Sequence, residues 1–456
     1  MPDVVFEPFK IKSVEPINFS TVEERKAWLK EAGYNMFGLP AERVMIDLLT
    51  DSGTSAMSHN QWAALISGDE SYAGSKDFYA LERVAREIFQ KDIVIPVHQG
   101  RAGEHLVFST LLKKGDIVPS NSHFDTTGAN IEDCGAEALN LPTKEGLDPF
   151  LVHPFKGNMD TEALKRLLKE KREHVPFVML TITNNTGGGQ PVSYRNISEV
   201  RKICDSYSLP LFIDGCRFAE NAYFIKLREN GFNNLSAKVI AQKTLSLADL
   251  VIFSAKKDAF ANIGGLVCLN DPELAERLKN RLVVTEGFAT YGGLAGRDLA
   301  AIAQGLLEIT DEHYLKYRLR TIEWMVERLA AEDIPVLRPA GGHALYIDAD
   351  SFFPNIPPEN FPGIALVNEL YIRGGIRAVE LGNVAFGKRD KDGKHIFPRL
   401  DLVRLAMPRR VYTEAHAAYV VEHIKALYRE RDKVSGWVFD KEAPVLRHFR
   451  STFKPA

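Results

Sequence analysis

Apolar segments of strand length alternate with helix-patterned segments between residues 93 and 257 of this 456-residue chain. The apolar segments lie at residues 93–97, 177–182, 209–214 and 251–253. The clearest helix is expected at residues 160–174, where Asp160 is a capping residue and Leu164 and Leu168 share one face. This alternation predicts an α/β fold with a mostly parallel sheet, whose ligand site lies at the carboxyl ends of its strands.

Polar residues stand where these strands are expected to end. Asp214 closes one apolar segment, Asn185 follows another, and Thr50 follows a further strand expected at residues 44–49. Lys257 comes shortly after the segment at 251–253. All four therefore fall at the edge where a parallel sheet binds its ligand.

A lysine pair follows the strand at 251–253, in the order Ser254, Ala255, Lys256, Lys257. A lysine on a rigid strand end, in a desolvated pocket, can form a Schiff base with an aldehyde cofactor. Taken alone, a lysine pair is more often a solvated turn between two strands. The rest of the chain favours the covalent role.

The strand at 93–97 leads into Gln99, Gly100 and Arg101 and then into a helix that extends to Leu112. A glycine-containing turn before a helix exposes amide groups at the positive end of the helix dipole, where a phosphate is held. The turn matches neither a P-loop nor the GxGxxG pattern, so it predicts a single phosphate rather than a nucleotide.

These pieces occur in an order that suits pyridoxal phosphate. That cofactor needs a carboxylate for its ring nitrogen, a cation or amide for its phenolate oxygen, an aromatic face, amide groups for its phosphate and a lysine for its aldehyde. The candidates in the chain are the turn at 99–103, Phe124, Asn185, Asp214 with Arg217, and Ser254 with Lys257.

Composition narrows the class of protein. The chain is 45% hydrophobic and 26% charged with a formal net charge of −3, so neither nucleic acid nor a membrane is expected as a partner. Its four cysteines have no paired spacing, and residues 1–12 contain no apolar stretch of signal-peptide length. We therefore expect free thiols and a cytoplasmic location.

The length favours two domains. We expect an N-terminal arm with part of the small domain at 1–57, a large cofactor-binding domain at 58–310 and a small C-terminal domain at 311–456. The strands of a smaller sheet are expected at Val336 and at residues 344–348, 376–380 and 402–407. Helices should flank them at residues 361–372 and 413–430.

Nearly from end to end, the chain carries motifs of one known family. They are Ile46-Asp47-Leu48-Leu49-Thr50-Asp51-Ser52-Gly53-Thr54, Gly68-Asp69-Glu70, Tyr72-Ala73-Gly74-Ser75, His98-Gln99-Gly100-Arg101, Gly188-Gly189-Gln190-Pro191, Glu220-Asn221-Ala222-Tyr223-Phe224-Ile225-Lys226, Tyr291-Gly292-Gly293-Leu294 and Pro408-Arg409-Arg410. On these motifs the chain resembles the tryptophanase and tyrosine phenol-lyase family. The resemblance implies a fold-type I pyridoxal-phosphate enzyme, similar to aspartate aminotransferase.

The resemblance also assigns residues to the cofactor. Lys257 would hold it covalently and, once released by the substrate, remove the Cα proton, while Asp214 would keep the ring nitrogen protonated. The remaining cofactor-binding residues implied are Gln99, Gly100, Arg101 and Ser254 at the phosphate, Phe124 on the ring, and Asn185 and Arg217 at the phenolate oxygen.

Substrate and cation residues follow from the same resemblance. Arg404 would bind the substrate carboxylate with Thr50, Ser52 and Asn185. Tyr72, from a neighbouring subunit, would protonate the leaving group. Glu70 would bind potassium with carbonyl oxygens near Gly53 and Asn262, and the expected assembly is a homotetramer.

The expected reaction is β-elimination of L-tryptophan to indole, pyruvate and ammonia. The phenol-lyases place an arginine where this chain has Leu381 and a threonine where it has Asp125, so the far end of the substrate pocket is expected to be apolar. Asp125 and His448 match tryptophanases. Without the resemblance, Leu381 could equally be a core residue and His448 a surface histidine. The alternatives are elimination from tyrosine or an S-substituted cysteine, and an inactive ligand-sensing homologue.

Overall fold

The computed structural model describes residues 5–456, so residues 1–4 of the expected N-terminal arm lie outside the described residues. The chain divides into two compact units, which are treated separately below. Unit 1 comprises Met1–Asp51, Leu147–His153 and Tyr317–Ala456, and unit 2 comprises Ser52–Gly146 and Pro154–Lys316.

Unit 2 is built on a seven-stranded sheet with the strand order β2-β8-β7-β6-β5-β3-β4. The strands are β2 (Ile93–Val97), β3 (Ile117–Ser120), β4 (Glu137–Asn140), β5 (Val178–Thr181), β6 (Leu211–Asp214), β7 (Leu250–Ser254) and β8 (Gly265–Leu269). The five strands from β7 to β4 in this order pair in parallel, whereas β8 is antiparallel to both of its neighbours. The mostly parallel α/β sheet expected from the sequence is therefore confirmed.

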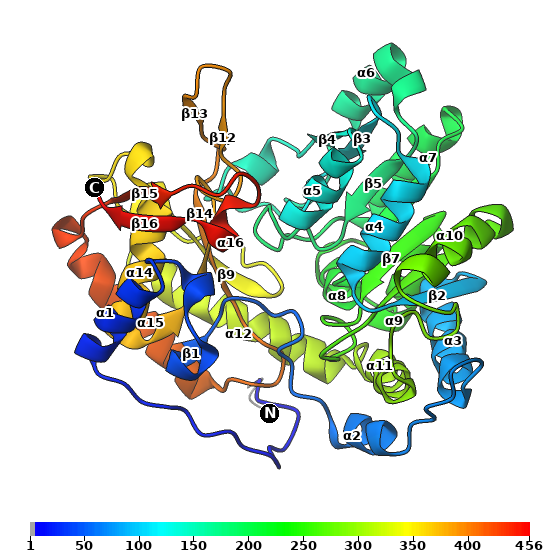
Figure 1. The fold of residues 1–456 in the computed structure, drawn as a ribbon, viewed down its shortest axis with the longest axis horizontal. Helices are drawn as coiled ribbons and strands as arrows, with labels where there is room; N and C mark the ends of the chain where they lie inside the picture. The colour runs from blue at the N-terminus through cyan, green and yellow to red at the C-terminus, as the bar shows by residue number, and fades with distance from the viewer. Residues whose placement is uncertain (1–4) are drawn as a thin grey trace. The chain divides into compact units, whose positions relative to one another are not determined.

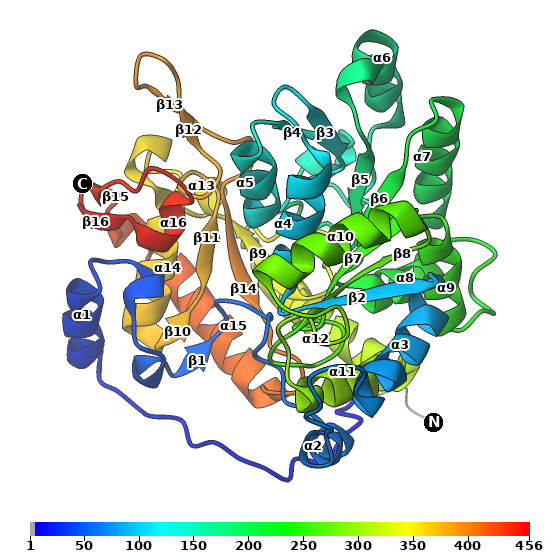
Figure 2. The same cartoon turned by 45° about the vertical axis from the view of Figure 1, so that its right-hand side comes forward.

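Helices surround this sheet (Figures 1 and 2). They are α2 (His59–Ile66), α3 (Lys76–Phe89), α4 (Gly100–Leu111), α5 (Asp125–Asp133), α6 (Thr161–Lys171), α7 (Tyr194–Ser206), α8 (Phe218–Arg228), α9 (Ala237–Ser246), α10 (Pro272–Thr285) and α11 (Gly296–Glu308). The helix α12 (Glu312–Ala330) contains the division between the two units. As predicted, the side chain of Asp160 caps the first turn of α6.

Strand β7 shows why the core strands read as continuous apolar runs. All five of its residues are buried. Ile252 packs in one core cluster with Leu106 of α4, whereas the ring of Phe253 lies 5.1 Å from that of Phe89 in α3. Because successive strand residues point to opposite faces, β7 is covered by helices on both sides and has no polar face.

Unit 1 contains smaller sheets, also drawn in Figures 1 and 2. A three-stranded sheet has the order β11 (Val379–Leu381), β14 (Leu402–Ala406), β9 (Ala344–Asp348), and β1 (Ile46–Asp47) pairs in parallel with β10 (Ile376–Arg377). Two hairpins are formed by β12 (Lys388–Arg389) with β13 (His395–Ile396) and β15 (Trp437–Lys441) with β16 (Thr452–Pro455). The helices are α1 (Val22–Glu31), α13 (Ala349–Phe352), α14 (Pro362–Gly374), α15 (Glu414–Arg429) and α16 (Arg447–Arg450).

The single strand expected at residues 376–380 is wrong. Its first part, β10, pairs in parallel with β1, and its second part, β11, pairs antiparallel with β14. Both parts are buried, and each combines apolar residues with one charged residue, Arg377 or Glu380, so their pattern contains no sign of the change of partner at Ala378. The strand expected at residues 44–49 is likewise reduced to the two residues of β1.

Within residues 5–456, no helix combines the length and apolarity needed to cross a membrane. The four cysteines, Cys134, Cys204, Cys216 and Cys268, are free thiols.

Candidate functional site

The ends of β6 and β7 place two of the predicted site residues on one face of the unit 2 sheet. Asp214 is the last residue of β6 and Ser254 the last residue of β7. Two residues before them, Phe212 and Ile252 belong to the core cluster that includes α4. Since alternate strand residues share a face, Asp214 and Ser254 lie on the α4 side of the sheet.

The turn before α4 lies directly against the end of β7. A Cβ atom added to Gly100 would be 2.7 Å from the Cβ atom of Ser254, and one added to Gly265 would be 2.8 Å from the Gly100 nitrogen. Only glycine permits this approach of the two backbones. The N-cap residue Gln99 makes no side-chain hydrogen bond to the first turn of α4. The amide groups of that turn are thus placed for an anion beside the Ser254 hydroxyl.

Three predicted charged residues lie close to one buried acid, Glu104 of α4. Burial and the Asp214 carboxylate raise the pKa of Glu104 to about 7, and the charges of Lys257 and Arg101 act in the opposite direction. The nearby Cys216 thiol also interacts with Asp214 and Lys257. The structure therefore brings Arg101, Asp214 and Lys257 together at the carboxyl edge of the sheet.

Asn185 and Arg217 are both buried near the end of β5. The backbone oxygen of Asn185 accepts a hydrogen bond from the Gly188 amide at 3.1 Å, which closes a turn. The backbone amide of Arg217 donates to the Ile182 oxygen at 3.2 Å. Both residues are therefore held by the backbone that follows β5.

Phe124 immediately precedes α5, and its backbone oxygen accepts a hydrogen bond from the Gly128 amide at 2.9 Å. Asp125 is the first residue of that helix, and its carboxylate accepts a hydrogen bond from the Thr126 amide at 2.5 Å. The start of α5 thus fixes the positions of both residues.

Lys256 is oriented toward Gly53. The Gly53 amide donates to the Lys256 oxygen at 2.7 Å, and a Cβ atom on Gly53 would be 2.6 Å from the Lys256 Cε atom. The Asn262 side-chain amide donates to the Gly53 oxygen at 3.0 Å, so Gly53 and Asn262 lie together, with Ser52 next in the chain. Burial and the Lys257 charge lower the pKa of Lys256.

Glu70 makes its contacts elsewhere in unit 2. Its carboxylate accepts hydrogen bonds from the Arg297 guanidinium at 2.7 Å and from the Gly296 amide at 3.2 Å. In the part of the chain that the structure describes, no group of three or more His, Cys, Asp or Glu side chains could hold a metal ion. The predicted potassium residues are therefore only partly brought together, with Gly53 beside Asn262.

Tyr72 lies in a surface loop and is 72% exposed. Its ring lies 5.1 Å from that of Tyr291, and a hydrogen bond with Tyr291 raises the pKa of Tyr72. The loop is held in place by the Gly74 amide, which donates to the Thr290 hydroxyl at 2.9 Å. Within its own chain, Tyr72 is thus directed at Tyr291.

The family model described as beta-eliminating lyase matches residues 47–423, which is most of the chain. The chain belongs to the beta-eliminating lyase family. It is therefore a lyase.

Individual relatives of this lyase align with it over almost its whole length. It is 56% identical over 450 residues to a tryptophanase of Hyphomonas neptunium, with 99% of each protein covered. It is 52% identical over 450 residues to a tryptophanase of Rhodobacter capsulatus, again with 99% of each covered. Identity to a tyrosine phenol-lyase of Symbiobacterium thermophilum is 44% over 450 residues, with 98% of each covered.

Solved structures support the fold of this lyase. Bna3p from Saccharomyces cerevisiae matches with a TM-score of 0.64 at 16% identity, covering 92% of this chain and all of that one. Together with the mostly parallel unit 2 sheet, this similarity confirms the α/β fold expected from the sequence.

The lyase holds its remaining predicted substrate residues in unit 1. Arg404 is buried in the middle of β14, and its guanidinium donates to the Leu49 oxygen at 3.0 Å, next to Thr50 in the chain. Leu381 is 3% exposed and packs in an apolar cluster, so its surroundings are those of a core residue. His448 is buried against Phe449, and the alternative of a surface histidine is wrong.

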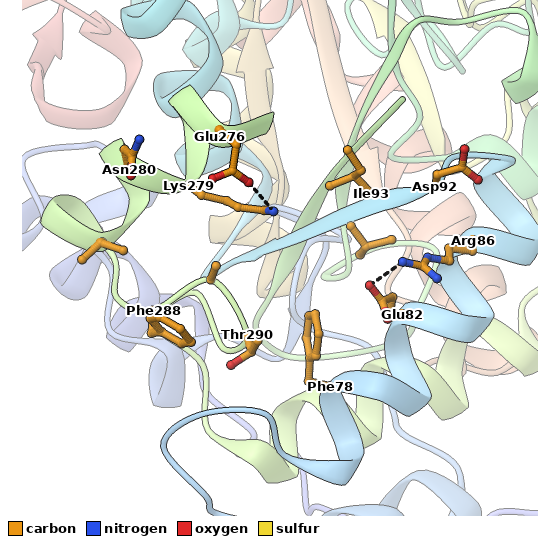
Figure 3. Close-up of a pocket in the computed structure, with 13 residues that line it drawn as sticks. Phe78, Glu82, Arg86, Asp92, Ile93, Glu276, Lys279, Asn280, Phe288 and Thr290 are labelled. Carbon is orange, nitrogen blue, oxygen red and sulfur yellow. Dashed lines mark hydrogen bonds and ion pairs between the residues drawn. The ribbon is translucent and has the colours of Figure 1, made fainter. Parts of the chain in front are cut away.

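A separate surface pocket of the lyase lies among α3, β2, α10 and residues 288–290 (Figure 3). Two ion pairs border it, Arg86 with Glu82 and Lys279 with Glu276. None of the residues lining this pocket is among the predicted site residues. The predicted site residues Asp214 and Ser254 lie instead at the carboxyl edge of the sheet.

The donor set at that edge fits pyridoxal phosphate. At the glycine turn before α4, a Cβ atom on Gly100 would clash with Ser254, so glycine keeps the amide groups of the turn beside the Ser254 hydroxyl, which suits a phosphate group. Asp214 is a buried carboxylate, as a ring nitrogen that must stay protonated requires. Lys257 and Asp214 both act electrostatically on Glu104.

Glu104 and Thr127 also lie at this site, although neither is among the residues predicted from the sequence. The Thr127 hydroxyl donates to the Glu104 carboxylate at 2.5 Å, and both side chains are buried. The spacing of Glu104 from the glycine turn is a signal that could have placed Glu104 at this site. Glu104 stands four residues after Gly100, so on a helix it lies one turn below the phosphate-type turn on the same face.

Proposed function

We propose that this lyase uses pyridoxal phosphate to eliminate indole from L-tryptophan, with pyruvate and ammonia as the other products. The observation that supports this substrate most strongly is the difference in identity between two groups of relatives. Three full-length tryptophanases are 50–56% identical, whereas full-length tyrosine phenol-lyases are 44% identical.

The cofactor would be held by the residues at the carboxyl edge of the unit 2 sheet. When bound there, it supplies a sink for the electrons released at the substrate Cα atom. Asp214 would keep a proton on the ring nitrogen, Lys257 would hold the aldehyde carbon, and Phe124 would cover the ring. The phosphate would lie on Gln99, Gly100, Arg101 and Ser254, and the phenolate oxygen on Asn185 and Arg217.

The chain's own groups move the protons of the reaction. The Lys257 amine takes the proton from the substrate Cα atom, and its proximity to Asp214 and Arg101 supports a role in the same site. The Tyr72 hydroxyl gives a proton to the ring carbon of the departing indole. The three-carbon fragment that remains is hydrolysed to pyruvate and ammonia.

Arg404 would bind the substrate carboxylate, because a planar guanidinium can donate two parallel hydrogen bonds to it. Thr50, Ser52 and Asn185 would contribute further hydrogen bonds. Leu381, Asp125 and His448 would contact the leaving group. The apolar surroundings of Leu381 support an indole over a phenol, whose hydroxyl would need a polar partner.

We also propose that the active unit is a homotetramer in the cytoplasm, with a potassium site made by Glu70, Gly53 and Asn262. The exposure of Tyr72 supports a role across a subunit interface. The proximity of Gly53 and Asn262 supports the cation site, and the four free cysteines support a reducing compartment.

The deciding experiment is incubation of the cofactor-loaded enzyme with L-tryptophan, L-tyrosine and an S-alkyl-L-cysteine in separate reactions. We expect indole and pyruvate in equal amounts from tryptophan and much slower release of phenol from tyrosine. Phenol or thiol release as fast as indole release would overturn the substrate assignment but not β-elimination. Absence of pyruvate with every substrate would favour a ligand-sensing homologue.

A further inference from the structure

Glu104 joins the two helices that begin at the predicted cofactor site. It is buried on α4, whose first turn carries Gly100 and Arg101. Its carboxylate accepts a hydrogen bond from the Thr127 hydroxyl at 2.5 Å. Thr127 lies on α5, the helix that begins after Phe124.

The charges facing Glu104 come from several elements. Asp214 at the end of β6 repels its negative form, whereas Lys257 after β7 and Arg101 on α4 stabilise that form. The buried thiol of Cys216 also faces this group. Glu104 is thus an acid poised between its two charge states near neutral pH, with burial and Asp214 favouring the neutral one.

We propose that Glu104 is a positioning residue of the cofactor site, whose carboxyl takes up a proton when the cofactor phosphate binds at the turn before α4. The proposal rests on the proposed function, because it requires a phosphate at that turn. Glu104 stands four positions after Gly100 on the helix, about 6 Å along the axis. At that separation a phosphate disfavours a second negative charge in a buried site.

The proposed proton uptake makes the affinity for the cofactor depend on pH. Binding that takes up a proton weakens as the pH rises through the range in which Glu104 ionises in the free protein. The neutral carboxyl still joins α4 and α5. Because it carries no charge, it does not compete with the phosphate for Arg101. Glu104 therefore adjusts its charge so that one buried site can hold both Asp214 and a phosphate.

The test measures the dissociation constant of pyridoxal phosphate from the wild type and Glu104→Gln at about pH 6 and about pH 8. For a roughly tenfold coupling between the two sites, the constant should rise about fivefold more in the wild type than in the variant. The ionisation of the free cofactor is common to both proteins and cancels in this ratio. Glu170→Gln, on the exposed face of α6, should behave as the wild type.

A second variant protects the test against misfolding of Glu104→Gln. Thr127→Val removes the donor that stabilises the ionised carboxylate of Glu104. The rise of the dissociation constant with pH should therefore occur at higher pH in this variant. In a second measurement, inorganic phosphate is added to the cofactor-free protein of each variant at the same pH values, and the shift of Tm is recorded. The order of the variants by this shift should match their order by the dissociation constant of pyridoxal phosphate.

The outcomes separate the two proposals. Parallel pH curves for the wild type and Glu104→Gln, with the cofactor bound normally, would overturn the role of Glu104. Failure to trap the cofactor on Lys257 by borohydride at any pH would overturn the proposed function instead. The proposal would also be contradicted if the dissociation constant rose at the same pH in Thr127→Val as in the wild type.

Discussion

The Arg409 guanidinium donates a hydrogen bond to the Asp51 carboxylate across 2.8 Å, and the two side chains are 0% and 1% exposed. The Arg318 guanidinium lies 3.8 Å from the same carboxylate and is also buried. All three residues belong to unit 1. Removing one charge from such a group leaves the others uncompensated in a medium that solvates them poorly.

We therefore expect Asp51→Asn to lower the free energy of unfolding by about 3 to 5 kcal/mol. The measurement is urea unfolding at neutral pH. Glu31→Gln is the matched control, because Glu31 lies at the surface in its ion pair with Arg43, and the change should cost less than about 1 kcal/mol. Equal losses in the two variants would show that the buried charges are not coupled as the structure indicates.

His123 should make the folded protein sensitive to acid. Burial lowers the pKa of its imidazole to about 4, although the ring hydrogen-bonds the Asn140 side chain at 2.8 Å. The unfolded chain therefore binds a proton below about pH 6.5 that the folded chain refuses until about pH 4, so stability falls as the pH falls through this window.

At about pH 5 this loss amounts to roughly 2 kcal/mol relative to neutral pH. Glutamine cannot be protonated in this range but can still donate a hydrogen bond to Asn140. We therefore expect His123→Gln not to lose this stability at about pH 5. Urea unfolding of both proteins at the two pH values gives the difference. An identical pH dependence in wild type and variant would place the acid sensitivity elsewhere.

Lys257 rather than Lys256 should carry the cofactor. The pKa of Lys256 is lowered by burial, so a neutral amine alone does not distinguish the two lysines. Their surroundings do, since Lys256 packs over Gly53 whereas Lys257 acts on the acids of the cofactor site. After borohydride reduction, peptide mapping should find the pyridoxyl group on Lys257, with Lys256→Arg labelled normally and Lys257→Arg unlabelled.

Tyr72 should act in the site of a neighbouring subunit. Mixing inactive Tyr72→Phe with inactive Lys257→Ala, followed by reassembly, should restore about a quarter of the wild-type activity, because half of the random pairs contain one intact site. Tyr79→Phe, an exposed tyrosine of α3, is the control and should remain active without mixing. Activity should also fall when sodium replaces potassium. A mixture as inactive as its components would place Tyr72 in the site of its own chain.

Leu381→Arg combined with Asp125→Thr should not improve tryptophan turnover. The guanidinium would enter an apolar cluster, so we expect indole release to fall by about tenfold or more and the protein to lose stability. Leu381→Met preserves the volume and should keep most of the activity. Indole and phenol release should be measured beside urea unfolding. Faster phenol release in a stable double variant would show that Leu381 contacts the leaving group.

The local pattern of the sequence was sufficient to predict the strands β2, β5, β6 and β7 of unit 2 and the helices α4 and α6. The continuous apolar run of β7, the cap at Asp160 and the glycine turn before α4 each depend on neighbours in the chain, so their spacing carries the information. Polar residues at strand ends indicated which edge of the sheet would bind a ligand.

Tertiary structure alone decided which side chains meet. Nothing in the spacing of residues 376–381 shows that β10 and β11 pair with different strands, because both partners are distant in sequence and both halves are buried. The contact between Glu104 and Thr127, and the effect of Asp214 on Glu104, likewise arise from packing α4 and α5 beside the end of β6. The charge state of a buried acid depends on these distances and on the exclusion of water, and both exist only once the chain has folded.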